Sequence, residues 1–241
     1  MKAFDIITRW LFILCLPFVV VTATIAWAFN SAWLYQHGFK KNQVGITTGL
    51  DEAALKATAQ GLISYFNSSD EYISLTVIKD GRPFVLFNER EAEHLKDVKV
   101  LVWLDYRVLL VTGVYALAYA VSCLFLRRHL RRSLAGGLVR GSGLTLAAMG
   151  GLGLGILAGF DQLFLQFHLF SFANDLWQLD PARDYLIMLV PRDFWYETFL
   201  IGAGVAAGAA VVLGGVGGGY LLFTRKQRPV AQVSPPVRLS K

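Results

Sequence analysis

Four apolar runs, each long enough to cross a lipid bilayer, constrain this chain more than any other feature. They cover residues 10–29, 100–126, 144–167 and 199–223. A membrane-spanning helix needs about 20 apolar residues, and the mean hydropathy of the chain is +0.48. The sequence therefore predicts a membrane α-helical protein built on a four-transmembrane-helix bundle. The first run is longer than the ~7–15 apolar residues of a secretory signal, so we expect a retained anchor.

Charge is distributed unevenly among the segments that connect these runs. Residues 127–140 carry five arginines and no acid, and residues 224–241 carry five basic residues and no acid. The segments 31–104 and 165–195 hold 13 of the 17 acidic residues, and there the acids outnumber the bases. Because loops rich in Lys and Arg stay in the cytoplasm, we expect both chain ends inside and the acidic segments outside. The net charge of +6 thus reflects topology and gives no support for nucleic-acid binding.

The segment between the first two spans is long enough for a small α+β extracytoplasmic cap. Residues 48–66 have an amphipathic helical pattern with Thr48 or Asp51 as the candidate N-cap, and Asp80-Gly81 between two short apolar runs predicts a hairpin. The expected order is a cytoplasmic N-terminus with transmembrane helix 1 (1–30), the cap (31–99), transmembrane helix 2 (100–126), a basic cytoplasmic loop (127–140), transmembrane helix 3 (141–167), an extracytoplasmic re-entrant or interfacial segment (168–195), transmembrane helix 4 (196–223) and a disordered basic cytoplasmic tail (224–241).

Glycines inside the last two spans repeat at four-residue spacing. Gly151, Gly155 and Gly159 form one such series, and Gly204 and Gly208 form another. Small residues at this spacing let helices approach closely in lipid. We therefore expect these glycines to lie at helix contacts within the bundle.

Two of the four histidines stand out as candidates for chemistry. His94 lies in FNEREAEHLKDVK (87–99) and His168 lies in a second polar stretch after the third span. Each sits at a junction between a polar segment and a span on the outer face, so the two can meet across the bundle. Imidazole changes its charge near neutral pH and serves as a general acid or base. The alternative is structural, with His94 on a solvated helix and His168 in an amphipathic interfacial loop.

Other polar side chains could support these histidines. If residues 88–99 are helical, three charged side chains share a face with His94, and Asp161 lies two helical turns before His168. An acid at that depth is costly unless it is paired or faces a wet cavity. The polar and aromatic residues of these stretches that are candidates to support a site are Arg90, Glu91, Asp97, Asp161, Asn174, Trp177, Asp180 and Asp184. No closely spaced pair of histidines is present, so we predict no metal.

Both stretches resemble motifs of the lipoprotein intramolecular transacylase family. Residues 87–99 fit F-x3-E-x2-H-x-x-D-V-K, and residues 168–194 fit H-x3-F-x-N-x2-W-x-L-D-P-x2-D-x-L-I-x3-P-x2-F. The four-span layout with both ends inside is also similar, and the resemblance covers nearly the whole chain through the fourth span. One departure is Leu95, where the family pattern has methionine.

The resemblance implies an enzyme of the bacterial cytoplasmic membrane, multi-pass, with its active site on the extracytoplasmic side. Its substrate would be a diacylated lipoprotein or lipopeptide within membrane lipid, and no obligate protein partner is evident. The family moves the sn-2 acyl chain of the diacylglyceryl-cysteine to the cysteine α-amino group and leaves a lyso-form lipoprotein. The resemblance implies no cofactor, and on it we expect His94 and His168 to act as the base and acid. The expected supporting roles are to orient the imidazoles (Glu91, Asp97, Asp161), to stabilise an oxyanion (Arg90, Asn174) and to shape the second polar stretch (Trp177, Asp180, Asp184). The rival hypotheses are a non-enzymatic membrane protein whose cap binds a partner, and a membrane esterase that releases the acyl chain to water.

Overall fold

Four long helices run the length of the molecule. The computed structural model describes residues 2–226, and the long helices are α1 (Lys2–Asn30), α5 (Glu89–Val121), α6 (Arg131–Ser171) and α8 (Arg192–Lys226). Each contains a window apolar and long enough to cross a membrane, which confirms the predicted four-span bundle. At about 1.5 Å per residue, the 33 residues of α5 extend to about 50 Å. A bilayer core is about 30 Å thick, so this helix has length to spare beyond the membrane.

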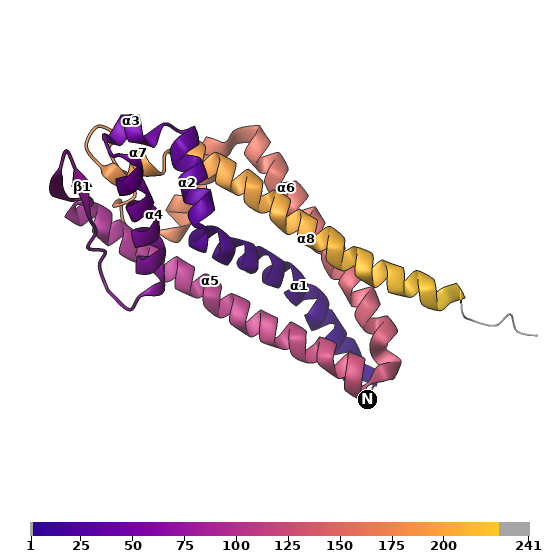
Figure 1. Ribbon diagram of the computed structural model, residues 1–241. Coiled ribbons are helices and arrows are strands. Elements are labelled where there is room, and N and C mark those ends of the chain that lie inside the picture. The colour runs from indigo at the N-terminus through magenta and orange to yellow at the C-terminus, as the bar shows by residue number, and fades with distance from the viewer. Residues whose placement is uncertain (1, 227–241) are drawn as a thin grey trace, which may run out of the picture.

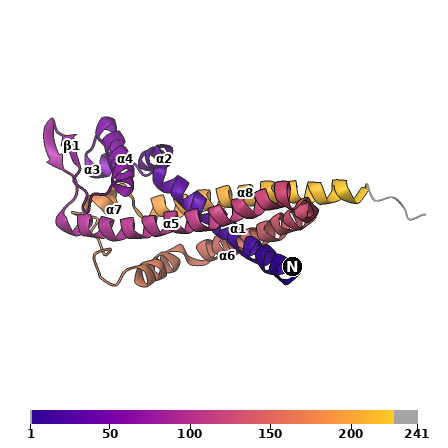
Figure 2. The ribbon, with the colours of Figure 1, turned by 90° about the horizontal axis from the view of Figure 1, so that it is seen from below.

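The bundle is held together mainly by three helix pairs. Helix α8 packs along α6, and α1 packs against both α5 and α6, crossing the other long helices obliquely in Figure 2. At the end of the bundle that carries the N-terminus, Phe12 of α1 stacks on Tyr119 of α5 with ring centroids 4.8 Å apart. The first residues of α1 and the last residues of α8 both lie away from the small elements that cover the opposite end (Figure 1).

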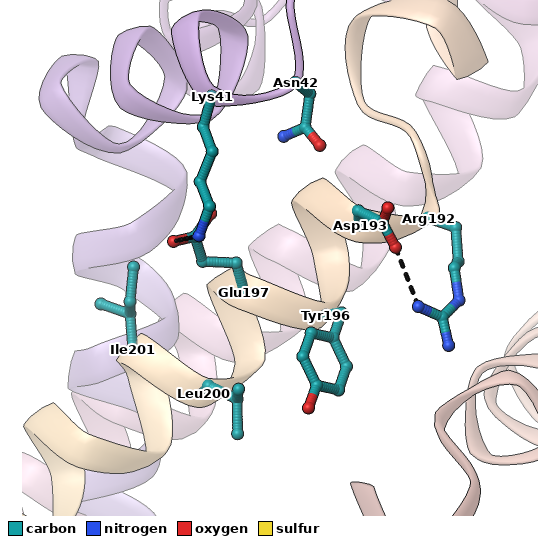
Figure 3. Close-up of a pocket in the computed structure, with 8 residues that line it drawn as sticks. All are labelled: Lys41, Asn42, Arg192, Asp193, Tyr196, Glu197, Leu200 and Ile201. Carbon is teal, nitrogen blue, oxygen red and sulfur yellow. Dashed lines mark hydrogen bonds and ion pairs between the residues drawn. The ribbon is translucent and has the colours of Figure 1, made fainter. Parts of the chain in front are cut away.

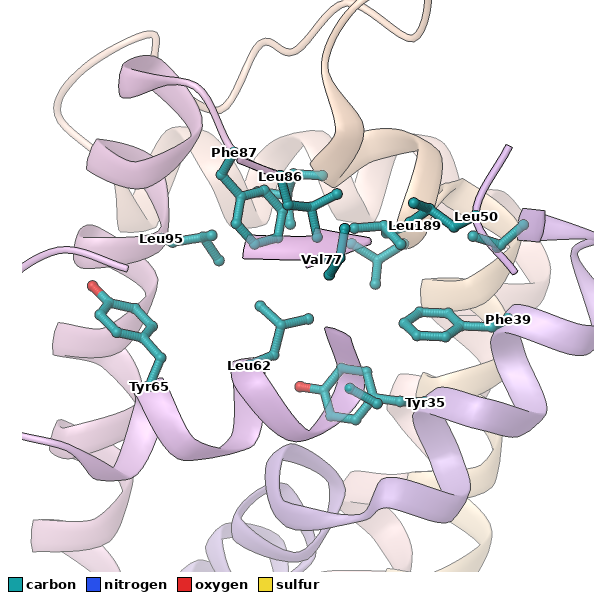
Figure 4. Close-up of a cluster of buried hydrophobic side chains, with 14 of the residues drawn as sticks. Tyr35, Phe39, Leu50, Leu62, Tyr65, Val77, Leu86, Phe87, Leu95 and Leu189 are labelled. Atoms are coloured by element: carbon teal, nitrogen blue, oxygen red, sulfur yellow. The ribbon is translucent and has the colours of Figure 1, made fainter. Parts of the chain in front are cut away.

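Those small elements form the predicted α+β cap. They are α2 (Ala32–Lys41), α3 (Val44–Thr48), α4 (Glu52–Asn67), the strands β1 (Thr76–Lys79) and β2 (Arg82–Val85), and α7 (Tyr185–Leu189). Their apolar side chains meet in one buried core, to which α5 adds Leu95 and α7 adds Leu189 (Figure 4). Because α7 follows the third span, the cap is completed by residues far from 31–99 in the sequence.

Two predicted elements of the cap are confirmed in detail. Asp51 caps α4, and its side chain accepts a hydrogen bond of 2.7 Å from the backbone N–H of Ala54. Strands β1 and β2 pair antiparallel with Lys79 opposite Arg82. Asp80 and Gly81 between them have φ values of 51° and 73°, as a two-residue type I′ hairpin turn requires.

Several boundaries differ from the prediction. Helix α6 begins at Arg131, so most of the expected loop 127–140 is helical, and the connection consists of a π-helical turn (Ser122–Leu126) and a 3₁₀ turn (Arg128–Leu130). No proline interrupts residues 131–140, and basic residues are no obstacle to a helix. The expected re-entrant segment 168–195 contains the end of α6, all of α7 and the start of α8. Of the expected tail, residues 227–241 lie outside the described part.

The prediction for the glycine series was wrong for most of its members. A methyl group at Gly151, Gly204 or Gly208 would meet no atom within 4 Å, so these glycines line no close contact in the described chain. Close approach occurs elsewhere: a methyl group at Gly217 would lie 2.6 Å from the Ala135 carbonyl oxygen. At Gly159 the backbone leaves the helical conformation, with φ 172° and ψ 82°, and α6 kinks. The four-residue spacing identified small residues, but it did not indicate which face of each helix packs against another helix.

Candidate active site

The two histidines singled out in the sequence lie together at the cap end of the bundle. His94 is in the second turn of α5, and His168 is in the last turn of α6. Their ring centroids are 6.4 Å apart, and the ring planes are inclined by 29°. The two residues are 7% and 8% exposed. The fold thus brings together two buried imidazoles from distant parts of the sequence, while their catalytic role remains a prediction.

A hydrogen bond fixes the proton position of the neutral His168 ring. Nδ1 of His168 lies 2.7 Å from the carbonyl oxygen of Phe164, one helical turn earlier. A carbonyl oxygen can only accept, so Nδ1 must carry the hydrogen. In the neutral ring, Nε2 then holds the free lone pair. His168 is therefore prepared to accept a proton at Nε2.

The His94 ring has a different environment. Its Nδ1 is buried and has no hydrogen-bond partner among residues 2–226. Removal from water disfavours a charged imidazole, and a second imidazole nearby disfavours it further. Before substrate binds, both rings are therefore favoured in the neutral form. A buried nitrogen without a partner leaves the His94 ring with an unused hydrogen-bonding position.

Aromatic side chains enclose the histidine pair. Phe164 meets the His168 ring edge-on at 4.4 Å between centroids, and Trp177 lies 4.9 Å from it. Phe172 contacts both imidazoles, at 5.0 Å from His94 and 5.7 Å from His168. This apolar enclosure limits water near the rings. Trp177 was a predicted supporting residue, whereas Phe164 and Phe172 were not predicted.

Glu91 anchors the start of α5, and within the described chain its carboxylate makes no hydrogen bond to either histidine. It is 1% exposed, and its carboxylate accepts hydrogen bonds from the N–H of Leu186 at 2.6 Å and the N–H of Asn88 at 2.8 Å. The Asn88 side chain in turn accepts from the N–H of Glu91, completing a capping box. Glu91 therefore joins the helix that carries His94 to α7.

Arg90 and Asp97 hold the polypeptide that follows His168. Arg90 donates to the carbonyl oxygens of Asp175 at 2.7 Å and Gln178 at 2.9 Å. Asp97, one turn after His94, accepts a hydrogen bond of 2.8 Å from the Asn174 side chain. These contacts fasten the 172–184 segment onto α5. The Arg90 guanidinium is therefore committed to backbone carbonyls, and a role in stabilising an oxyanion stays a prediction.

Asp180 and Asp184 shape the same segment. Asp184 is 2% exposed; it accepts from the Asn88 side chain at 2.9 Å and from the N–H of Asp180 at 2.7 Å. The Asp180 carboxylate accepts from the N–H of Ala182 at 2.9 Å. Of the predicted supporting residues, these two thus hold the backbone and lie outside the aromatic enclosure.

Asp161 pairs with an arginine of α8, and no hydrogen bond joins it to either histidine within the described part of the chain. Its carboxylate is 76% exposed and pairs with Arg192 at the start of α8, with Nε and Oδ1 2.5 Å apart. Arg192 also lies over the rings of Phe160 and Tyr196. Asp161 and His168 both follow the kink at Gly159, so they lie on one helical stretch. Because its carboxylate is committed to Arg192, an orienting role for Asp161 stays a prediction.

A cavity of about 670 Å³ opens beside the same end of α8, and Figure 3 shows the side chains around it. Its charges are satisfied within the protein: Lys41 bonds to Glu197 at 2.5 Å, and Arg192 bonds to Asp193 at 2.8 Å. None of the predicted site residues lines it. The cavity is therefore separate from the histidine pair.

Phe164 and Asn88 were not predicted from the sequence as residues of the site. Phe164 lies four residues before His168, which is the spacing of a helical face, but phenylalanine is too common in spans to stand out. Asn88 with Glu91 fits the pattern of a capping box and could have been found.

Within residues 2–226, no group of three His, Cys, Asp or Glu side chains is arranged to hold a metal ion.

Comparison with known proteins identifies relatives of the whole fold. The sequence model of the family described as lipoprotein intramolecular transacylase Lit matches residues 10–195. A solved structure of the membrane-integral lipoprotein intramolecular transacylase Lit from Bacillus cereus superimposes with a TM-score of 0.81 at 20% identity, covering 95% of this chain and 100% of that one. Two structures of Bacillus cereus variants, with one histidine replaced by arginine or alanine, give TM-scores of 0.74 and 0.75 at 19% and 18% identity. They cover 94% of this chain and 96% and 97% of theirs. No curated protein sequence matches.

Proposed function

The chain belongs to the lipoprotein intramolecular transacylase family, a family of membrane enzymes, and from that premise we propose the reaction in detail. The enzyme moves the sn-2 acyl chain of a diacylglyceryl-cysteine to the α-amino group of the same cysteine. The product is an N-acyl, S-monoacylglyceryl lipoprotein. The observation that carries the proposal is the pair of buried imidazoles, 6.4 Å apart, at the cap end of the bundle.

The proton balance of this transfer suits two bases. An α-ammonium carries three protons; the product amide keeps one, the glycerol hydroxyl gains one, and the third is released to water. The first proton goes to His94, and attack of the neutral amine on the ester carbonyl gives the second to Nε2 of His168. The C–O bond to glycerol breaks as His94 returns its proton to the leaving oxygen, and His168 releases its proton to water. No external acyl donor is needed.

The surroundings support these assignments. The Nδ1–H of His168 is committed to the Phe164 carbonyl, which leaves Nε2 as the acceptor. Nδ1 of His94 has no partner among the described residues, so no protein hydrogen bond at that atom fixes which ring nitrogen of His94 carries the proton. Amine and ester belong to one molecule, and holding them together gives the large rate advantage of an intramolecular reaction.

Topology is part of the proposal. We place both chain ends in the cytoplasm and the histidine pair on the extracytoplasmic side, because the arginine-rich turns at 127–132 lie at the opposite end of the bundle from the cap. Impermeant thiol labelling of intact cells tests this, using a variant with Cys15 and Cys123 replaced by serine. A single cysteine at Ser74→Cys in the cap should be labelled from outside, and one at Ser133→Cys should not. The reverse pattern refutes the topology.

The reaction is tested with purified protein and a diacylated lipopeptide, followed by mass spectrometry. Transfer leaves the total mass unchanged and moves one acyl chain onto the N-terminal fragment, whereas hydrolysis removes an acyl mass and simple binding changes nothing. His94→Ala and His168→Ala should each lower the rate by at least ~10²-fold, the usual contribution of a general acid or base. His129→Ala, in the basic turn before α6, is the matched control and should keep the wild-type rate. Near-wild-type rates in both site variants would refute the pair.

A further inference from the structure

A second polar groove lies on α5 beside the cap. It has a volume of about 410 Å³, and one wall is the loop that follows α4. The other wall is a stripe of α5 side chains at helical spacing. The lining residues are Ser68, Ser69, Asp70, Glu71, Lys96, Lys99, Val100, Trp103 and Arg107.

This groove is separate from the histidine pair. Successive residues in an α-helix are rotated by about 100°, so Trp103, nine residues after His94, points in the opposite direction. The two sites therefore share α5 but occupy opposite faces of it. A ligand in the groove need not touch the imidazoles.

Two of the three basic side chains that line the groove, Lys99 and Arg107, form no ion pair with a carboxylate within residues 2–226. Lys99 is 8% exposed, and its ammonium donates to the Asp70 carbonyl at 2.7 Å and to Ser68 Oγ at 3.3 Å, both neutral acceptors. Arg107 has no hydrogen bond or ion pair to any other residue in 2–226. Lys96, in contrast, is paired with Glu71. Three bases and two acids line the groove, so its net charge is positive.

The walls of the groove add no further negative charge. The Lys99 ammonium lies 4.1 Å from the centre of the Tyr65 ring. Burial raises the pKa of Tyr65 to about 12, so this phenol stays neutral and donates to the Glu71 carbonyl at 2.9 Å. The most favourable ligand is therefore an anion that meets Lys99 and Arg107.

The groove lies where the apolar run of α5 begins. Val100 is 63% exposed, and the Trp103 indole donates to the Phe66 carbonyl at 3.0 Å, an arrangement typical of membrane interfaces. Side chains on a helix point toward its N-terminus, which for α5 is the cap end. Arg107 can therefore extend from within the apolar run toward headgroup level.

We propose that this groove binds a phosphate-type anion, supplied by the phosphodiester of a membrane phospholipid. Guanidinium and ammonium groups are the usual partners of phosphate oxygens, and Val100 and Trp103 provide apolar contact for the first part of the acyl chains. The proposed transacylase substrate has a thioether-linked glyceryl group and no phosphate. This site is therefore for a second lipid and stands independently of the reaction.

Native mass spectrometry of the full chain in detergent tests the proposal, by titration with phosphatidylglycerol, with diacylglycerol, which lacks the phosphate, and with inorganic phosphate. Wild-type protein should retain phosphatidylglycerol and release diacylglycerol. Arg107→Gln should weaken phosphatidylglycerol binding at least about tenfold, equivalent to roughly 1.4 kcal/mol. The matched control is Arg82→Gln, an exposed base in the hairpin outside the groove, and it should bind within about twofold of wild type, since it removes one charge from elsewhere.

Lys99→Gln provides a second variant, with the same expected loss. Because Lys99 also holds the loop after α4, this variant could unfold, and Arg107→Gln keeps the proposal testable in that case. Unchanged binding in Arg107→Gln, or diacylglycerol binding as tight as phosphatidylglycerol, would overturn the anion site. Inorganic phosphate binding as tightly as the lipid would support an anion site and overturn the lipid as its source.

Discussion

Glu91 offers the sharpest test of how the site is supported. Glu91→Gln preserves the shape of the side chain but leaves one carbonyl oxygen where two carboxylate oxygens accept from Leu186 and Asn88. One backbone N–H must then face the amide NH₂ and lose its partner. A hydrogen bond to a charged group contributes about 1.5–3 kcal/mol.

This loss predicts a measurable fall in the melting temperature. At about 2–4 °C per kcal/mol for a chain of this size, Glu91→Gln should melt roughly 3–12 °C below wild type. Thermal unfolding in detergent, followed by tryptophan fluorescence, measures this directly. Because α5 would be less firmly joined to α7, transfer by Glu91→Gln should also slow.

Glu93→Gln is the matched control. It makes the same chemical change two residues along the same helix, and Glu93 forms no side-chain hydrogen bond or ion pair within residues 2–226. Its melting temperature should stay within about 2 °C of wild type, since a surface substitution usually changes stability by no more than ~0.5 kcal/mol. Equal melting temperatures for the two variants would refute the anchoring role of Glu91.

Three further predictions follow from the site. Asp161→Asn should keep transfer within twofold of wild type and lower the melting temperature by less than about 4 °C, because an exposed ion pair contributes only ~0–1 kcal/mol; a loss comparable to that of the histidine variants would return Asp161 to the active site. Proton release distinguishes transfer from hydrolysis: with an α-amino pKa of ~7.7–8.0, transfer should release nearly one proton per turnover at pH 7 and almost none at pH 9.5, whereas hydrolysis would still release about one at the higher pH. EDTA should leave the rate unchanged, since the proposed steps need only imidazoles; inhibition reversed by a divalent ion would point to a metal.

The parts of the fold that depend on local pattern could be predicted from the sequence. The four spans follow from apolar length, α4 from its periodicity and the Asp51 cap, and the hairpin from Asp80-Gly81. These signals lie within a few residues of one another, so no knowledge of the rest of the chain is needed.

The hydrogen bonds that hold the segment around the histidines in place could not be predicted from local sequence patterns. Glu91 and Leu186 are 95 residues apart, and Asp97 and Asn174 are 77 apart. A carboxylate in a polar stretch carries no sign of which distant N–H it will meet. Asp161 shows the same limit: helical spacing relates it to His168, but its ion-pair partner is an arginine on another helix, 31 residues away.

The division of the histidine pair between α5 and α6 has a consequence for biogenesis. His94 emerges from the ribosome 74 residues before His168, and the contacts that fasten the two helices together come later still, from residues 174–186. A nascent chain with only its first two spans inserted therefore has half a site and no aromatic enclosure. Acyl-transfer competence should arise late and abruptly during membrane insertion, when the third span and the segment after it dock against α5. Two separately expressed halves, divided in the turn before α6, should be inert alone and recover transfer when they are produced together.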